Sequence, residues 1–143
     1  MKTALLVVAV LVVGGLLLWW GRPGTGAERN DGEMRSMTFN LREQSDSSQS
    51  GKATIEERND GTKVTIELSN EPRGATEPAH IHFGSCPNPG AVKYPLNPVM
   101  NGRSETLINS SYDTVVSGGP LAVNVHESAQ KLNAYVACGN LEE

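Results

Sequence analysis

Two alternating segments joined by a tight turn constrain the fold of this chain more than any other feature of its sequence. Lys52–Arg58 and Thr62–Ser69 alternate apolar and polar residues, and Asn59-Asp60-Gly61 lies between them. Such alternation is typical of half-buried β-strands, and an Asp-Gly pair between two of them is a strong hairpin signal. The sequence therefore predicts an antiparallel hairpin, which must bury its apolar face against further strands.

Most of the remaining chain also has the pattern of short strands separated by turns. Further strands are expected at Met37–Glu43, around residues 79–84, and at Glu105–Asn109, Leu121–His126 and Ala134–Cys138. Residues 86–101 contain four prolines and are expected to be irregular, and residues 110–120 are expected to be a loop. Seven or so short strands at this spacing predict an all-β fold, either an antiparallel sandwich or a Greek-key barrel.

The N-terminal residues have a different character. Residues 3–20 form an apolar run of 18 residues that ends in Trp19-Trp20. This run just reaches the length of a membrane-spanning helix, and tryptophans often anchor such helices at the membrane interface. We expect an uncleaved membrane anchor, and a signal peptide cleaved near residues 25–27 is the alternative. In either case the protein would be extracytoplasmic, in the periplasm or at the cell surface, membrane-anchored or secreted.

These patterns divide the chain into three expected parts. Residues 1–20 are the signal or anchor, 21–34 a polar, turn-rich linker, and 35–143 one β-domain of ordinary size. From Glu28 onward, 10 Lys and Arg face 16 Asp and Glu, which gives a net charge of −6. The absence of a basic stripe from the sequence argues against nucleic acid as a partner. The N-terminal segment is the expected contact with a membrane.

All three histidines lie in two of the expected strands. His80 and His82 are two residues apart, so their side chains point to the same face of a strand. His126, on a neighbouring strand, would complete a site of three imidazole nitrogens. Imidazole suits copper, zinc, iron or nickel, so the residues alone predict a transition-metal site without naming the metal. The alternative is that three histidines without a shared role fell within a β-domain.

The two cysteines have a simpler interpretation. Cys86 and Cys138 are an even number in a chain that is expected to be exported, which favours one structural disulfide. The alternative roles are thiolate ligands of a metal or redox-active thiols. Metal-binding cysteines more often form a short Cys-x-x-Cys motif, and these two lie far apart in the sequence.

The histidines and cysteines, with their neighbours, resemble the Cu/Zn superoxide dismutase family over about residues 38–141. The motifs that carry the resemblance, in the family's order, are His80-Ile81-His82, Cys86, Leu96-Asn97-Pro98, Val125-His126-Glu127-Ser128-Ala129 and Val136-Ala137-Cys138-Gly139. The resemblance implies a Greek-key, immunoglobulin-like β-sandwich or barrel. It also implies that His80, His82 and His126 are copper ligands and that Cys86 and Cys138 form the intrasubunit disulfide.

Several departures from the family's pattern limit what the resemblance implies. Pro95 stands where the family has its bridging histidine, and no histidine between His82 and His126 replaces the zinc ligands. Tyr135 stands where the family has its active-site arginine, and the aspartate linking the two metal sites is missing near residues 130–131. A degenerate member that keeps three copper ligands and lacks zinc is therefore expected.

Three neutral imidazoles suit Cu(I), because Cu(II) prefers a fourth, tetragonal ligand. We therefore expect an exported protein that binds or transfers copper, with another copper protein as a further partner, rather than an efficient dismutase. A fourth ligand would be water, Met100, Met34 or Met37, although linker or core positions are the simpler interpretation of these methionines. Zinc held by three histidines and a water is the alternative metal.

Two other functions compete with copper binding. One is a copper-only superoxide dismutase, which would need a substitute cation such as Lys93 or Arg103 to attract its anionic substrate. The other is a metal-free extracellular interaction module of the chordin type, which this chain also resembles in its β-strands and histidines. Metal content would distinguish the interaction module, and activity per copper would distinguish the enzyme. The sequence does not specify the oligomeric state.

Overall fold

The computed structural model describes residues 34–141 of the chain, which form eight β-strands and one short helix. In chain order these elements are β1 (Ser36–Glu43), β2 (Ser50–Arg58), β3 (Gly61–Ser69), β4 (Glu77–Phe83), β5 (Val92–Val99), β6 (Arg103–Ile108), α1 (Tyr112–Val116), β7 (Leu121–His126) and β8 (Tyr135–Asn140). The predicted all-β class is therefore confirmed. The expected anchor at residues 1–20 and nearly all of the expected linker lie outside the described residues.

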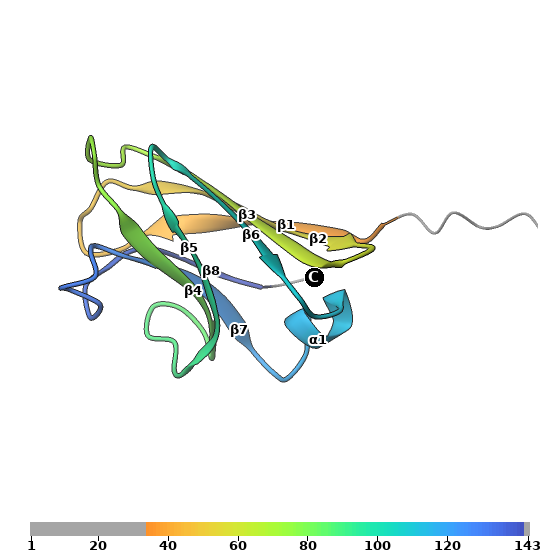
Figure 1. Cartoon of the computed structure of the whole chain (residues 1–143). Helices are drawn as coiled ribbons and strands as arrows, with labels where there is room; N and C mark the ends of the chain where they lie inside the picture. The colour runs from red at the N-terminus through yellow and green to blue at the C-terminus, as the bar shows by residue number, and fades with distance from the viewer. Residues whose placement is uncertain (1–33, 142–143) are drawn as a thin grey trace, which may run out of the picture. The chain divides into compact units, whose positions relative to one another are not determined.

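The eight strands form one antiparallel sheet that is nearly closed into a barrel. Their order is β5-β4-β7-β8-β1-β2-β3-β6, so that β5 and β6 are the two ends of the sheet. Asn97 on β5 joins these ends, because its backbone N–H donates to Thr106 Oγ1 at 2.8 Å and its side-chain amide donates to the Glu105 carbonyl at 2.6 Å. Figure 1 shows β1, β2, β3 and β6 on one side and β4, β7 and β8 on the other.

The predicted hairpin lies at the centre of the first side. β2 and β3 pair antiparallel along their whole length, from Ser50 opposite Ser69 to Arg58 opposite Gly61. A side chain at Gly61 would place its Cβ 2.3 Å from the Ile108 carbonyl of β6, and the φ angle there is +144°. Only glycine fits this conformation and this close approach, which explains why the turn ends at that residue.

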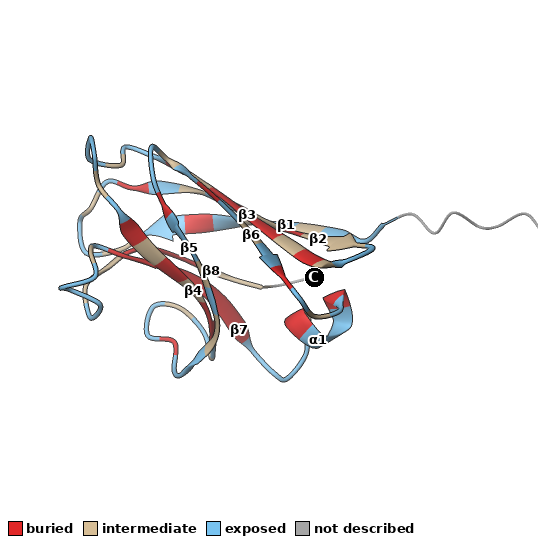
Figure 2. Cartoon of the chain, viewed as in Figure 1, coloured by how far each residue is buried: buried red, intermediate tan, exposed pale blue. Residues whose placement is uncertain are grey.

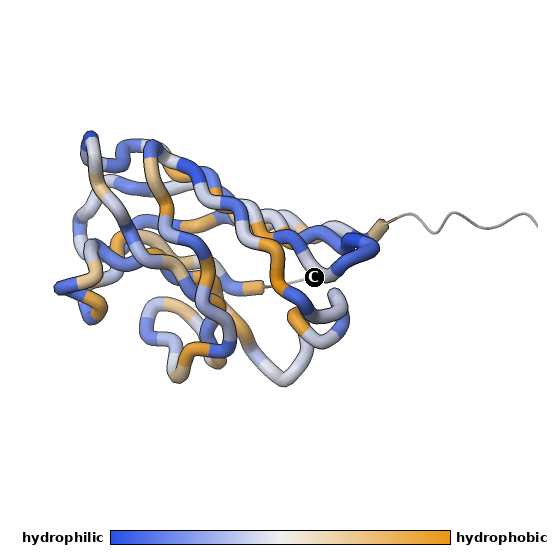
Figure 3. The backbone as a smooth tube through the Cα atoms, viewed as in Figure 1, coloured by the Kyte–Doolittle hydropathy of each residue, from blue (hydrophilic) through white to orange (hydrophobic). Residues whose placement is uncertain are grey.

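Both sides of the barrel contribute apolar side chains to one core. Buried residues lie along β4, β7 and the middle strands in Figure 2, and the apolar segments of Figure 3 follow the same strands. The buried core residues are Leu41, Ala53, Ile55, Val64, Ile66, Leu68, Ala79, Ile81, Val99, Ile108, Tyr112, Val115, Leu121, Val123, Val125, Val136 and Ala137. Their alternation with polar residues along most strands is the pattern from which the strands were predicted.

Two elements differ from the expectation. Residues 92–99 were expected to be irregular because of their prolines, but they form β5. This strand lies at one end of the sheet and takes its backbone pairing from β4, so Pro95 and Pro98 are tolerated as they are on edge strands. Residues 110–120 were expected to be a loop, but they include α1, which Ser111 caps by accepting a hydrogen bond from the Thr114 N–H.

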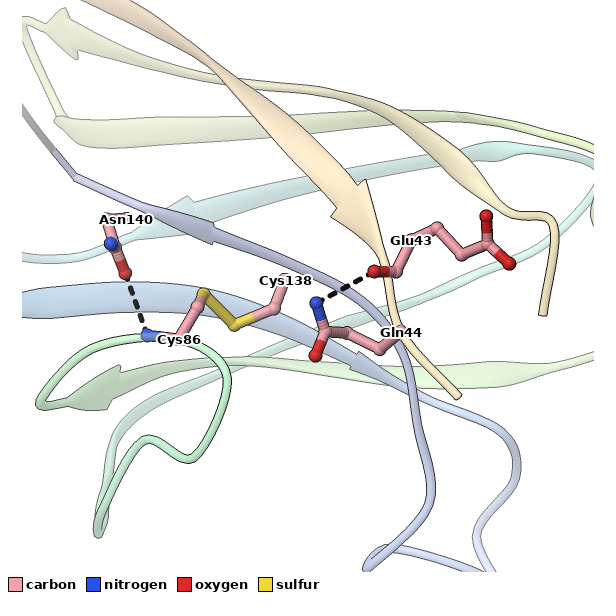
Figure 4. Close-up of a disulfide and its surroundings, with 5 residues drawn as sticks. All are labelled: Glu43, Gln44, Cys86, Cys138 and Asn140. Atoms are coloured by element: carbon pink, nitrogen blue, oxygen red, sulfur yellow. Dashed lines mark hydrogen bonds between the residues drawn. A yellow bond between two sulfur atoms is a disulfide. The ribbon is translucent and has the colours of Figure 1, made fainter. Parts of the chain in front are cut away.

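The cysteines form a disulfide beside the shortest strand pairing of the sheet, which is the one between β1 and β8. Cys86 and Cys138 are bonded with their Cα atoms 5.9 Å apart, and Asn140 Oδ1 accepts a hydrogen bond of 2.8 Å from the Cys86 N–H (Figure 4). β1 pairs with β8 at only two positions, of which one is Arg42 opposite Cys138. The disulfide therefore links the loop after β4 to β8 where β8 meets β1.

The described residues contain no candidate for a membrane-crossing helix.

Candidate metal centre

The three histidines lie on the outer face of the β4–β7 half of the barrel. On β4, His80 and His82 alternate with Ala79 and Ile81, which point into the core. β7 runs antiparallel beside β4 with Ala79 opposite Val125, which is also a core residue. His126 follows Val125 and therefore points outward with the two histidines of β4. The predicted same-face arrangement is thus present, and neighbouring strands supply it.

Two of the three rings are oriented by backbone carbonyls. His82 Nδ1 lies 2.9 Å from the Gly90 carbonyl, and His126 Nδ1 lies 2.6 Å from the Leu132 carbonyl. Because a carbonyl oxygen only accepts hydrogen bonds, each ring must carry its hydrogen on Nδ1. Nε2 of each ring therefore carries a lone pair, as a metal ligand requires.

These lone pairs converge with a nitrogen of the third ring. One ring nitrogen from each histidine lies within 4.8 Å of the others, and His80 Nδ1 is 2.8 Å from His126 Nε2. His82 Nε2 is buried and has no hydrogen-bond partner among the described residues. Three nitrogens bound to one ion at about 2.0 Å would lie about 3.3–3.5 Å apart. A three-nitrogen site therefore requires the closest pair, now 2.8 Å apart, to open by about 0.5 Å and the widest pair, at up to 4.8 Å, to close by about 1.3–1.5 Å.

Burial lowers the pKa of two of the three histidines. Burial, with smaller contributions from the neighbouring histidines, lowers the pKa of His80 to about 4. Burial also lowers the pKa of His126, although the Leu132 carbonyl opposes this change. Protons therefore compete less for these imidazoles at neutral pH than for exposed ones, and neutral imidazole is the form that binds metals.

Two loops cover the cluster and limit its contact with water. His82 and His126 are only 4% and 3% exposed, whereas His80 is half-buried. The loop 84–91 supplies Gly90, and the loop 127–134 supplies Leu132. The sequence analysis missed these two residues because a backbone acceptor has no residue-type signature. His80 is thus the most accessible of the three rings.

The residues that distinguish this chain from the resembled family also lie near the site. Tyr135 packs edge-on against His126 with 5.2 Å between the ring centroids. Pro95 lies opposite His80 across β4 and β5. Neither side chain adds a metal-binding nitrogen to the cluster.

Lys93 and Arg103, the two cations that could attract an anion in place of the family's arginine, are bonded to other groups. Lys93 Nζ donates to backbone carbonyls at the C-terminal end of α1, including those of Thr114 at 2.9 Å and Val115 at 2.8 Å. Arg103 forms ion pairs with Glu67 at 2.7 Å and Glu105 at 2.5 Å.

The proposed methionine ligands are not on the histidine strands. Met100 lies in the turn between β5 and β6 and is half-exposed. Met37 lies on β1 opposite Ile55, and Met34 precedes that strand. Their participation in the site stays a prediction.

No protein-family model matches the sequence, and no curated protein matches it. The chemical interpretation therefore depends on the geometry of the site. A cluster of three imidazoles, two of them held by backbone carbonyls, is compatible with a metal centre.

Proposed function

We propose that the protein binds copper through His80, His82 and His126, with a preference for Cu(I), and functions in copper binding or transfer. The observation that carries the proposal is the convergence of three imidazole nitrogens within 4.8 Å on one face of the sheet. Three imidazoles provide the low coordination number that Cu(I) accepts, and Cu(II) would require a further, tetragonal ligand. Zinc would complete its tetrahedron with a water and is the metal to compare in the experiments.

The site geometry also fits a protein that releases its ion. Among the described residues no backbone carbonyl is bonded to His80, which is half-buried, whereas carbonyls hold the other two rings. A copper ion bound here would therefore leave first through the His80 side, where an acceptor protein has access. This asymmetry supports another copper protein as the partner.

We further propose that the domain is a degenerate relative of the Cu/Zn superoxide dismutases that does not bind zinc at a second site. The sheet places β7 beside β4 and β4 beside β5, and hydrogen bonds of Asn97 join β5 to β6 across the two ends of the sheet. This arrangement is compatible with a Greek key, in which three consecutive strands have the fourth beside the first. The disulfide and the outward-facing histidines agree with the motifs of that family.

Efficient dismutation is the less favoured activity. Lys93 and Arg103 already bind carbonyls and carboxylates, and Tyr135 places an aromatic ring rather than a cation beside His126. Neither of these two cations is therefore free to draw an anion to the cluster, and residues 28–143 have a net charge of −6.

We also propose that the domain is exported. The disulfide between Cys86 and Cys138 supports this, because such bonds persist mainly in oxidising compartments. The apolar run at residues 3–20 supports a signal peptide or a membrane anchor.

The deciding experiment is a titration of the metal-free protein with Cu(I) and with Zn²⁺ against a competing chelator. Each of His80→Ala, His82→Ala and His126→Ala should weaken Cu(I) binding by at least about 10–100-fold. Arg73→Ala, an exposed charge in the loop before β4, is the control and should bind as tightly as the wild type. Equal affinity in the three histidine variants and the wild type would exclude the site and favour a metal-free interaction module.

A further inference from the structure

A second hollow lies at the mouth of the barrel, lined by none of the three histidines among the described residues. Three loops surround it, namely β1–β2, β3–β4 and β7–β8, which come together at the left end of the molecule in Figure 1. The cavity has a volume of about 390 Å³, and residues from these loops line it with residues from the adjacent strand ends. This volume lies within the range of small-molecule sites in proteins.

Two buried polar side chains form the floor of the cavity. Gln49 and Glu77 are 2% and 1% exposed, and Gln49 Nε2 donates to Glu77 Oε1 at 2.7 Å. The second oxygen of each side chain, Gln49 Oε1 and Glu77 Oε2, is buried and has no hydrogen-bond partner in the described chain. Gln49 Oε1 is an acceptor, and Glu77 Oε2 is an acceptor when the carboxyl group is ionised, so a ligand that supplies hydrogen-bond donors would satisfy both atoms.

The charge around the floor favours a cation. Burial raises the pKa of Glu77, the hydrogen bond from Gln49 opposes this change, and the nearby carboxylates of Glu71 and Glu127 add to the rise, so a bound cation would be needed to stabilise the ionised form. A negative field at a buried carboxyl group attracts positive charge and repels anions. Within residues 34–141 no lysine or arginine lines the cavity, and Lys131 is bonded at 2.6 Å to Glu127, which does line it.

The number of oxygens distinguishes an organic cation from a metal ion. Calcium takes six to eight oxygen ligands, and magnesium requires an octahedral set. The floor offers two free oxygens, and the only described group of three His, Cys, Asp or Glu placed to hold a metal is the histidine cluster. An ammonium group donates three hydrogen bonds and needs no such coordination shell. Tyr135 also lines the cavity and offers an aromatic ring to a cation or to an alkyl chain.

We propose that the barrel mouth is a binding site for a small primary ammonium ligand. Its ammonium group donates to Glu77 Oε2 and Gln49 Oε1, and its alkyl part contacts the wall formed by Tyr135 and the loops. Among the described residues no histidine lines the cavity, although Tyr135, which lines it, also packs against His126.

The test is a calorimetric or NMR titration of the full chain with n-propylammonium chloride, with 1-propanol as the neutral probe of similar shape. The ammonium should bind with a Kd of about 1 mM or tighter, and the alcohol should bind at least about tenfold more weakly. Glu77→Gln removes the charge and should weaken ammonium binding at least about tenfold. Glu105→Gln, an exposed carboxylate on β6, is the matched control and should change nothing.

Two results would overturn the proposal. The first is equal binding of 1-propanol and the ammonium by the wild type, which would show an apolar hollow filled without charge recognition. The second is unchanged ammonium affinity in Glu77→Gln, which would place any binding elsewhere. The wild-type comparison decides the proposal even where the variant folds poorly. Cu(I) binding by the same samples tests the metal centre separately.

Discussion

His80 Nδ1 lies 2.8 Å from His126 Nε2, although the two residues are 46 positions apart in the sequence. The Leu132 carbonyl holds the hydrogen of His126 on Nδ1, so His126 Nε2 can only accept. The hydrogen between the two rings therefore belongs to His80 Nδ1. A metal ion that binds this nitrogen must displace that hydrogen, and His80 then carries its hydrogen on Nε2.

This relationship predicts a tautomer change at one histidine only. Metal-free protein should show all three rings with the hydrogen on Nδ1, and Zn²⁺ or Cu(I) should convert His80 alone to the Nε2–H form. Long-range ¹H–¹⁵N correlation spectra of the imidazoles distinguish the two tautomers. His82 and His126 serve as internal controls, because carbonyls fix their Nδ1–H groups. A conversion at His82 or His126 would contradict the assigned ligand atoms.

The second prediction concerns the pH dependence of stability. The pKa of His80 falls from 6.5 to about 4 on folding, so between these values the unfolded chain binds a proton that the folded chain excludes. The stabilising contribution of the neutral ring is therefore complete above about pH 6.5 and is lost as the pH falls toward 4. Urea denaturation of the metal-free protein at several pH values measures this slope.

The matched variant is His80→Gln, which keeps a polar side chain but removes the titration. Its free energy of unfolding should depend less on pH between 4 and 6.5 than that of the wild type. Parallel curves for the two proteins would show that His80 is not held neutral by the fold.

A third prediction concerns the disulfide. Cys86 and Cys138 are separated by 52 positions, and opening a loop of this length should cost about 4 kcal/mol of unfolding free energy by the loop-entropy relation. Urea denaturation of the Cys86→Ser/Cys138→Ser double variant measures the loss, with the pH held constant. Gly90, whose carbonyl orients His82, lies in the loop that begins at this disulfide. The variant should therefore also bind Cu(I) more weakly, and unchanged affinity would show that the loop is held by other contacts.

The close approach of β8 to β1 provides a fourth prediction. A Cβ at Gly139 would lie 2.3 Å from the Asn40 carbonyl, so Gly139→Ala must push the two strands apart. The expected cost is about 1–3 kcal/mol of unfolding free energy, with faster amide hydrogen exchange at the Arg42–Cys138 pair. Gly119→Ala is the control, because its Cβ would meet nothing within 4 Å although its φ is +102°. That variant should be strained locally and leave exchange at the pair unchanged.

The local residue pattern was sufficient to predict most strands. It failed where contacts with distant parts of the chain determine the secondary structure. The turn at Asn59-Asp60-Gly61 and the alternation beside it specify the β2–β3 hairpin without reference to the rest of the chain. β5 was missed because Pro95 and Pro98 argue against a strand, and only its place at the end of the sheet makes them acceptable.

The site was predictable to a similar extent. The spacing of His80 and His82 placed them on one face, but only the pairing of β4 with β7 brings His126 beside them. The burial of Glu77 had no signal at all, because a glutamate in a sequence is normally expected at the surface. Side-chain periodicity is local, whereas strand order and cavity formation depend on the whole chain.

The last prediction is that the copper-loaded protein is a poor superoxide dismutase. Three imidazoles favour the reduced ion, whereas dismutation needs both oxidation states, and Tyr135 gives the site no cation beside His126. Without steering, the encounter rate should be about 10–10³-fold lower than in a guided site and should not fall as salt is added. Pulse radiolysis across ionic strengths measures both properties. Tyr135→Arg should raise the rate and make it fall with salt, whereas the Tyr135→Phe control should do neither. A wild-type rate near the ceiling of about 10⁸–10⁹ M⁻¹s⁻¹ that falls with salt would establish the enzyme instead.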